Sequence, residues 1–451
     1  MFIQSFKSDG LSHLSYLIGN RGEAVVIDPR RDCEAYAEAA AAKGCRLTTI
    51  LETHRNEDLI SGAPVLADLT GARVYHGPNA AGEVCYAETV REGHEFRFGN
   101  LILKVLETPG HTDDSLSFAL YDTDFSEQSV AVFTGDTLFI GDVGRTDFYP
   151  DRAEEVAGLL YDSLQKLLAL GDQTLIYPAH GAGSVCGNNM ADREFSSIGY
   201  ERQNNPMLQI HSRQAFIDHK IGERHYQPPY FRDMERLNLK GCKPAKRILT
   251  PAALSPKAYK NLPQQAVTLD VRNISSFLGA HLPGSVALPV PMIPAFAGWF
   301  LRPDDELALV ASDAQEAEQA ARHLARIGFD KVLGYLAPDM PHWAATAEPF
   351  NVVTAIDVDE FESRRNNPPH HWHLLDVRGK EEVDENPVDG AIHHYVGKLI
   401  ATAKEMTASH HYTVMCGSGA RATIAASILM RQGFQNVDVF LGSFGALMAD
   451  T

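Results

Sequence analysis

The sequence predicts an α/β and α+β multidomain protein with three domains, at residues 1–245, 246–350 and 351–451. Length is the first indication, because a chain of 451 residues exceeds the size at which a single hydrophobic core stops growing. Alternation is the second: up to about residue 245, short apolar runs alternate with amphipathic helical stretches. An internal repeat in the rest of the chain is the third.

Composition excludes several kinds of partner. The chain is ordinary globular material, with 44% hydrophobic and 22% charged residues. Its net charge of -18 provides no basic patch for nucleic acid and argues against binding to an anionic membrane surface. No apolar run of about 18 residues appears, and the N-terminus lacks the pattern of a signal peptide. The six cysteines are scattered without a C-x-x-C pair, so we expect reduced thiols and a cytoplasmic protein.

The apolar runs of the front part end in polar turns that carry His, Asp or Gly. Such runs include "EAVVIDP", "LTTILET", "VAVFTGDTLF" and "QTLIYPAHG", and residues 153–170 have the pattern of an amphipathic helix. This arrangement is typical of strands that deliver side chains to one rim of a sheet. The following segment, "LKGCKPAKRILTPAALSPKAY", contains three prolines and four lysines, and we interpret it as a linker.

The back part contains a duplicated module. "VTLDVRN" matches "HLLDVRG", and "ARHLARIGFDKV" matches "AASILMRQGFQNV". Both matches have an offset of about 105 residues, which is a normal size for one domain. The matches align Asp270 with Asp376, Arg272 with Arg378, and Gly328 with Gly433. Each copy is predicted to be an α/β unit that begins with a strand and D-V-R and ends with strand, loop, helix and a G-F turn.

The loop after the last strand of the second copy, "VMCGSGARATIAASILM", has the features of a sulfur site. Cys416 ends the strand, Gly417 and Gly419 free the backbone to curl, and Arg421 follows as the helix begins. Converging N–H groups, the helix N-terminus and the arginine all favour a thiolate or a persulfide. A buried cysteine in a tight turn is the inert alternative. A phosphatase is the other active alternative, but there five residues normally intervene between the cysteine and the arginine, whereas four intervene here.

These pieces together resemble the rhodanese family of sulfurtransferases over residues 352–451. The resemblance implies that Cys416 carries sulfur and that Arg421 assists it. In the first copy, Ala311 replaces the cysteine and Glu316 replaces the arginine, so this copy resembles the inactive repeat of tandem rhodaneses. We expect it to be structural, and an inactive module of this kind favours self-association into a homo-oligomer.

The stretch "ILETHRNEDLISGAP" resembles the T-H-x-H-x-D-H loop of the metallo-β-lactamase superfamily. His54 and Asp58 match the motif, while Asn56 and Leu59 replace two of its three histidines. Three further loops follow in the order of that superfamily: "ETPGHTDDSLSF" with His111, "VFTGDTLF" with Asp136, and "YPAHGAG" with His180. The resemblance covers residues 1–245 and implies an αββα sandwich.

The surviving metal residues predict iron rather than a pair of zinc ions. Asn56 weakens the first site of a dinuclear hydrolase, and Leu59 removes a ligand from the second. His54, His111 and Asp136 remain, which is the donor set of mononuclear Fe(II) oxygenases. One branch of the superfamily, the persulfide dioxygenases, uses these three positions. This resemblance implies one Fe(II) per chain, with Asp58 and His180 orienting the ligands.

Two further residues are candidates for substrate handling. Arg145, in "GRTDF", resembles the persulfide dioxygenases at this point and could meet the anionic part of a substrate; a surface salt bridge is the alternative. Cys186 lies in "HGAGSVCGNN", on a Gly-rich loop expected above the metal. It could accept or relay sulfane sulfur, or simply be a small loop residue.

The fusion resembles persulfide dioxygenase–sulfurtransferases, whose function is sulfide detoxification. A thiol persulfide (of glutathione, coenzyme A or another thiol) would react with O₂ to give sulfite, and the Cys416 persulfide would convert sulfite to thiosulfate. Linked sites would raise the effective concentration of the intermediate. A zinc thioester hydrolase of the glyoxalase II type with appended rhodanese modules is the main alternative. A metal-free sulfur-carrier or scaffold protein is the third.

Overall fold

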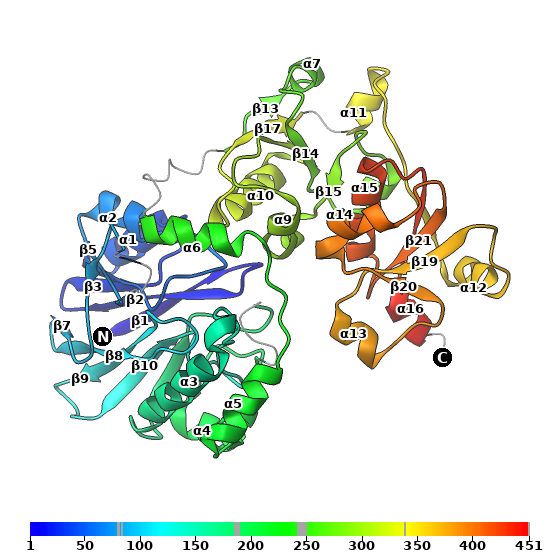
Figure 1. Ribbon diagram of the computed structural model, residues 1–451. Coiled ribbons are helices and arrows are strands. Elements are labelled where there is room, and N and C mark those ends of the chain that lie inside the picture. Colours follow the sequence, from blue (N-terminus) through cyan, green and yellow to red (C-terminus); the bar gives the residue numbers. More distant parts are fainter. Residues whose placement is uncertain (79–81, 83, 185–189, 241–249, 338–339, 450–451) are drawn as a thin grey trace. The chain divides into compact units, whose positions relative to one another are not determined.

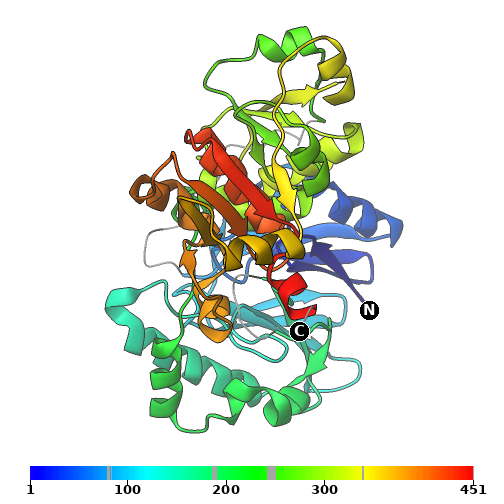
Figure 2. The ribbon, with the colours of Figure 1, turned by 90° about the vertical axis from the view of Figure 1, so that its right-hand side faces the viewer.

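The computed structural model describes residues 1–78, 82, 84–184, 190–240, 250–337 and 340–449, and the chain forms two compact units. Residues 1–248 make the first unit, together with residues 326–328, and the remainder makes the second. Each unit builds its own sheets (Figures 1 and 2). Among the helices of the described residues, none is long and apolar enough to cross a membrane.

The first unit is a sandwich of two six-stranded sheets (Figure 1). One sheet has the order β1-β2-β3-β4-β5-β6, and the other β12-β11-β10-β9-β8-β7. The strands of the first sheet are β1 (Phe2–Ser8), β2 (His13–Asn20), β3 (Glu23–Ile27), β4 (Arg46–Leu51), β5 (Arg73–His76) and β6 (Glu88–Thr89). Those of the second are β7 (Glu95–Phe98), β8 (Leu101–Glu107), β9 (Leu116–Asp122), β10 (Ser129–Gly135), β11 (Leu175–Pro178) and β12 (Ser196–Ser197).

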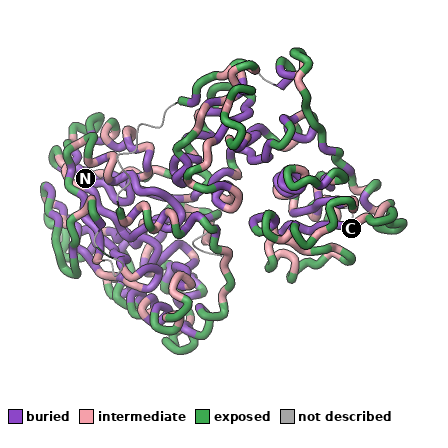
Figure 3. Tube along the Cα trace, turned by 45° about the horizontal axis from the view of Figure 1, so that its top comes forward, coloured by how far each residue is buried: buried purple, intermediate pink, exposed green. Residues whose placement is uncertain are grey.

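Apolar side chains from both sheets fill the space between them. Ile18 and Val25 of the first sheet pack in one cluster with Leu103, Phe118 and Phe133 of the second. Alternate residues of a strand point to opposite faces, so residues of the other parity are free to contact helices on the outside. Most strand residues of the unit are buried or half-buried (Figure 3).

Helices cover the outer face of each sheet and complete the predicted αββα sandwich. They are α1 (Glu34–Ala42) and α2 (Ala63–Thr70) on the first sheet, and α3 (Ala153–Leu168), α4 (Ile198–Asn204) and α5 (Arg213–Gly222) on the second. In α3 the buried residues Val156, Leu160, Leu164 and Leu167 recur at helical spacing, so one face packs on the sheet. The predicted helix at 153–170 is therefore confirmed. A further helix, α6 (Phe231–Lys240), contacts the loop that follows β4.

The second unit contains two parallel five-stranded sheets of matching order, β13-β17-β16-β14-β15 and β18-β22-β21-β19-β20. The strands of the first are β13 (Ala253–Leu254), β14 (Val267–Asp270), β15 (Val286–Ala287), β16 (Leu307–Val310) and β17 (Val332–Leu336). Those of the second are β18 (Thr354–Ile356), β19 (Trp372–Asp376), β20 (Ala391–His393), β21 (His411–Met415) and β22 (Asn436–Phe440). The matching order confirms that a complete module is duplicated.

Helices flank each of these parallel sheets, as expected for α/β domains. The first sheet has α7 (Pro256–Lys260), α8 (Ile274–Gly279), α9 (Ile293–Phe300), α10 (Ala314–Arg326) and α11 (Met340–Ala345). The second has α12 (Val358–Asn366), α13 (Lys380–Glu385), α14 (Leu399–Thr402), α15 (Ala420–Arg431) and α16 (Ser443–Ala449). The segment predicted to be a linker already contains β13 and α7, so that prediction is wrong for its last third.

Candidate metal centre and cysteine loop

His54 lies at the end of β4, where the first sheet delivers its loops. Its Nδ1 is 2.9 Å from the hydroxyl of Thr53, and that hydroxyl donates to Asp28 Oδ2 at 2.8 Å. The Thr53 N–H donates to Asp28 Oδ1 at 2.7 Å. Because the hydroxyl proton is used on Asp28, His54 must donate from Nδ1 to the Thr53 oxygen. Its Nε2 lone pair is thereby available to a metal.

The other two candidate ligands follow glycines that let two loops approach closely. Gly110 precedes His111 with a φ of 142°, and a Cβ there would meet the backbone of Leu160 in α3. Gly135 ends β10 with a φ of 53° and packs against the Thr53 side chain, directly before Asp136. Side chains would obstruct both approaches, so the two glycines are needed to bring the ligands together.

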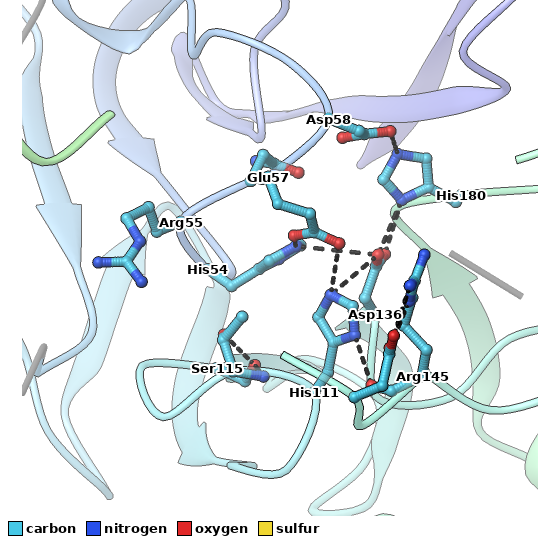
Figure 4. Close-up of polar contacts among 12 residues, drawn as sticks. His54, Arg55, Glu57, Asp58, His111, Ser115, Asp136, Arg145 and His180 are labelled. Atoms are coloured by element: carbon cyan, nitrogen blue, oxygen red, sulfur yellow. Dashed lines mark hydrogen bonds and ion pairs between the residues drawn. The ribbon is translucent and has the colours of Figure 1, made fainter. Parts of the chain in front are cut away.

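The predicted metal residues converge on one buried point (Figure 4). His54 Nε2 is 3.8 Å from Asp136 Oδ2, and His111 Nε2 is 3.5 Å from the same oxygen. The His111 ring is fixed by its Nδ1, which donates to the carbonyl of Arg145 at 3.0 Å. Among the described residues, His54, His111 and Asp136 are the group whose ligand atoms lie close enough together to hold one metal ion.

The electrostatics of this point suit a cation. Both Nε2 atoms are buried and make no hydrogen bond within the described chain. Burial lowers the pKa of His54, which favours the neutral imidazole that binds metals. Burial alone would raise the pKa of Asp136, but His180, His54 and His111 around it lower that pKa, so the carboxylate is ionised. Burial alone would lower the pKa of His111, but the carboxylates of Glu57 and Asp136 outweigh it and raise that pKa, so a metal would compete with a proton for His111 Nε2. Two imidazoles and one carboxylate are a donor set that fits a divalent metal.

His180 and Asp58 lie directly behind the candidate ligands, as the sequence predicted. His180 Nδ1 is 2.8 Å from Asp136 Oδ1, and its Nε2 is 3.1 Å from Asp58 Oδ2. His180 thus connects two carboxylates and fixes the orientation of Asp136 (Figure 4). Because its Nδ1 is bonded to Asp136, His180 is placed to position that candidate ligand.

Arg145 makes the salt bridge that the alternative predicted, but the arginine itself is buried rather than on the surface. Its guanidinium makes two bonds to Asp147, with Nε 2.6 Å from Oδ1 and Nη2 2.7 Å from Oδ2. The pair lowers the pKa of Asp147 to about 2 despite partial burial. The backbone carbonyl of Arg145 also orients His111. A role in binding an anionic substrate remains a prediction for Arg145.

Two functional candidates escaped the sequence analysis. Glu57 is buried, and its Oε1 lies 3.2 Å from His111 Nε2, inside the metal centre. The signal was available, because this acidic residue lies in the same loop as the two lost histidines. Asn238 of α6 donates to the carbonyls of Asn56 and Leu59 at 2.7 and 2.8 Å. No sequence pattern marks that asparagine.

Cys416 is buried at the start of the predicted sulfur loop. Its Sγ accepts the N–H of Gly419 at 3.1 Å, and Gly419 has a φ of 99° that turns the chain into α15. The Cys416 N–H is bonded to Ser443 Oγ at 3.1 Å. The loop thus curls around the sulfur as expected. Cys186, the other predicted sulfur carrier, lies outside the described residues.

Arg421 stands at this loop in an ion pair with Glu382 of α13. Its Nη1 and Nη2 donate to the two carboxylate oxygens at 2.5 and 2.7 Å. Burial would lower the pKa of Arg421, but Glu382 outweighs that effect and raises it. A Cβ on Gly417 would come within 3.3 Å of Arg421 Nη2, so the guanidinium borders the loop. The sequence did not indicate Glu382.

The corresponding loop of the first copy contains no cysteine that could carry sulfur. Ala311 is buried where the cysteine would lie. Glu316 accepts the N–H of Ser312 at 2.6 Å, and the Glu316 N–H is bonded to Asp313 Oδ1 at 2.8 Å. Side chains of the loop itself therefore accept two of its amide N–H groups.

Comparison with known proteins identifies the family of the first unit and the domains of the second. The family model described as the metallo-beta-lactamase superfamily matches residues 8–180, and the rhodanese-like domain model matches residues 255–346 and 357–450. The persulfide dioxygenase ETHE1 of Mus musculus is 34% identical over 201 residues, which are 44% of this chain and 71% of that protein. The chain belongs to the metallo-beta-lactamase superfamily. Its second unit contains two rhodanese-like domains.

Other relatives are named for a different activity. A hydroxyacylglutathione hydrolase of Methylobacterium sp. (strain 4-46) is 39% identical over 138 residues, which are 30% of this chain. The match spans about half of that enzyme, 49% of its length. A solved structure described as a metallo-beta-lactamase from Staphylococcus aureus matches with a TM-score of 0.68 and 31% identity, over 74% of this chain and 98% of that one. The shared architecture thus extends beyond the metal-binding unit.

Proposed function

We propose that the protein is a persulfide dioxygenase coupled to a thiosulfate-forming sulfurtransferase. The observation that carries this proposal is the grouping of His54, His111 and Asp136 around one buried point. Two imidazoles and one carboxylate are the donor set of mononuclear Fe(II) oxygenases. The similarity to the mouse persulfide dioxygenase supports the same substrate class and a dioxygenase reaction.

The residues around this point disfavour a second metal. A dinuclear site of this superfamily would need a ligand at Leu59, which offers only a buried apolar side chain. We therefore infer a mononuclear site with one ion per chain.

In this proposal the chain's own residues hold, orient and shield the reaction centre. Fe(II), when bound by His54, His111 and Asp136, would supply the redox chemistry that allows O₂ to react with a thiol persulfide. The overall change is RSSH + O₂ + H₂O → RSH + SO₃²⁻ + 2H⁺, in which the outer sulfur is oxidised and O₂ is reduced. His180 keeps Asp136 oriented, and the Arg145 carbonyl does the same for His111.

Sulfur transfer would occur at Cys416. Its thiolate attacks the outer sulfur of a second RSSH, forming a Cys416 persulfide and releasing RSH. Sulfite then attacks that sulfur, which releases thiosulfate and regenerates the thiolate. The Gly419 N–H, which points at Sγ, stabilises the anionic sulfur in both steps. Arg421 adds positive charge at the edge of the loop for the approaching oxyanion.

Metal analysis of anaerobically prepared protein tests the proposal. We expect about one iron per chain and persulfide-dependent O₂ uptake. His111→Ala should lose both, because it removes one of the two nitrogen donors. His94→Ala, a control at an exposed histidine, should lose neither. Full iron retention in His111→Ala would refute the assignment.

A thioester hydrolase of the hydroxyacylglutathione hydrolase type is the second candidate, favoured by the 39% identity to such an enzyme. It predicts bound zinc, no O₂ uptake and release of glutathione from an acylglutathione. The same metal analysis separates the two candidates. A scaffold protein would bind no metal in this experiment.

A further inference from the structure

The loop that replaces the usual histidines brings a second carboxylate into the metal centre. Glu57 is 2% exposed, and its Oε1 lies 3.2 Å from His111 Nε2. Its other oxygen is 4.0 Å from His54 Nε2. These two nitrogens are the atoms through which the histidines would bind a metal. Glu57 therefore lies beside the same two histidine nitrogens as Asp136 (Figure 4).

The spacing of these atoms fits coordination by Glu57. Donor atoms about 2.1 Å from one octahedral metal are about 3 Å apart when they occupy neighbouring positions. Glu57 Oε1 is 3.2 Å from His111 Nε2, whereas Asp136 Oδ2 is 3.5 Å from it. Glu57 thus meets this spacing at His111 more closely than the aspartate does.

Backbone contacts, rather than a metal, hold Glu57 in this direction. The Asn238 amide nitrogen donates to the carbonyls of Asn56 and Leu59, on either side of Glu57. Its amide oxygen accepts the N–H of Ser61 at 2.9 Å. The Tyr230 hydroxyl donates to the Asp58 carbonyl at 3.1 Å. Four hydrogen bonds from α6 and the residues before it therefore fix the loop with Glu57 turned inward.

We propose that Glu57 is a fourth protein ligand of the divalent metal, completing a set of two histidines and two carboxylates. Two carboxylates neutralise a divalent cation, and oxygen donors favour iron or manganese over softer metals. A six-coordinate ion would then keep two positions for exogenous ligands instead of three. The inference rests on the metal site of the proposed function, but not on iron or on persulfide as substrate.

Co(II) is a suitable probe, because its visible spectrum reports the number and kind of ligands without O₂ chemistry. The full chain should bind about one Co(II). Glu57→Gln and Glu57→Ala should weaken Co(II) binding, measured by chelator competition, by more than about 100-fold, beyond the usual effect of a residue that only orients a ligand. Their visible bands should also shift, and Glu57→Asp should restore part of the affinity.

Glu52→Gln is the matched control. Glu52 is an equally buried glutamate just before the metal loop, but its carboxylate bonds to Ser61 and Tyr86 instead. Its substitution should leave the Co(II) affinity and spectrum unchanged. If the two Glu57 variants behave like this control, Glu57 is only an ion-pair partner of His111 and the proposal is overturned.

Crystals of the parent protein loaded with Co(II) give a second measurement that needs no variant. Anomalous scattering locates the ion, and a Glu57 oxygen at about 2.1 Å supports the proposal, whereas one beyond about 3 Å refutes it. Failure of the proposed function is distinguishable from failure of this inference. A protein without persulfide-dependent O₂ uptake, but with Glu57-dependent Co(II) binding, would refute the former and support the latter.

Discussion

The two rhodanese-like domains share a scaffold and differ in one loop. Both contain a parallel five-stranded sheet with the same strand order. Both also end their D-V-R strand with a buried Asp–Arg pair. Arg272 Nε is 2.8 Å from Asp270 Oδ1, and Arg378 Nε is 2.9 Å from Asp376 Oδ2. The two domains therefore share both the sheet and the ion pair that stabilise the fold. They differ in the loop that carries Cys416 in the second domain.

The loops differ in how the following helix begins. In the first domain α10 starts at Ala314, with Asp313 accepting the N–H of Glu316 as a helix cap. In the second domain the aligned position is Gly419, whose left-handed conformation delays α15 by one residue. The delay leaves the Gly419 N–H for Cys416 Sγ. The first copy thus has an ordinary helix cap where, in the second copy, a backbone N–H is bonded to the cysteine sulfur.

The largest effect is expected from Cys416→Ser. Because a hydroxyl cannot form a persulfide, thiosulfate formation should fall by at least about 1000-fold. Oxygen uptake with a persulfide substrate should continue, since the metal site shares no residue with this loop, and sulfite should accumulate. Ion chromatography of the products together with an oxygen electrode measures both.

Ala311→Ser is the matched control for this variant, because it makes the corresponding change in the first domain and should alter neither reaction. Loss of oxygen uptake in Cys416→Ser would contradict the proposed direction. The cysteine would then deliver substrate to the metal, and sulfur would flow from the rhodanese-like domain to the dioxygenase site.

Asp270→Asn and Asp376→Asn are expected to lower the stability of the second unit by similar amounts. Each change leaves a buried arginine without its charged partner, which costs about 3–5 kcal/mol of unfolding free energy. All three tryptophans, Trp299, Trp343 and Trp372, belong to the second unit, so tryptophan fluorescence during urea denaturation reports on this unit alone. Asp389→Asn at an exposed position is the control. A much smaller loss in the first domain would show that the inactive copy has relaxed its scaffold.

Much of this organisation was predictable, because it depends on local patterns. The αββα sandwich, the duplicated α/β module, the His54–His111–Asp136 group and the curled Cys416 loop all follow from strand, turn and glycine signals that lie close together in the sequence. Glu57, Asn238 and Glu382 were not identified. Asn238 contacts a loop more than 170 residues away, and Glu382 contacts Arg421 at a separation of 39 residues. No periodicity encodes such contacts.

The predicted linker shows the same limit of prediction from local sequence. Its Pro- and Lys-rich composition predicts irregular structure, yet Ala253 and Leu254 form β13 by pairing with Tyr335 and Leu336 of β17. A two-residue strand has no alternation to detect, so only its distant partner defines it. Residues such as these are specified by tertiary contacts rather than by their own sequence.

Glu382→Gln is expected to improve sulfite binding modestly. Glu382 neutralises Arg421 beside the sulfur loop, so removing its charge should strengthen the positive field at Cys416. Because the Glu382 side chain is 45% exposed, solvent screens the effect. We expect the KM for sulfite to fall by about two- to fivefold at low salt, with a smaller change at high salt. Glu381→Gln, the neighbouring glutamate on α13, should show no change. A drop in kcat instead would mean that Glu382 positions Arg421 for the reaction.

The smallest effect is expected from Ala311→Cys, which returns a thiol to the silent loop. In the Cys416→Ser background this variant should show less than about 1% of the parent sulfur transfer. The first domain has no counterpart of Arg421 or of Gly419 to stabilise a thiolate at position 311. Glu316 instead places a carboxylate on the Ser312 N–H and repels a sulfur anion.

Alkylation by iodoacetamide should accordingly be slower at Cys introduced at 311 than at Cys416 in the parent. Adding Glu316→Arg should speed alkylation by removing that repulsion and supplying positive charge. Substantial sulfur transfer by the Ala311→Cys/Cys416→Ser double variant, without Glu316→Arg, would show that the missing sulfur atom, and not the helix cap, silences the first domain.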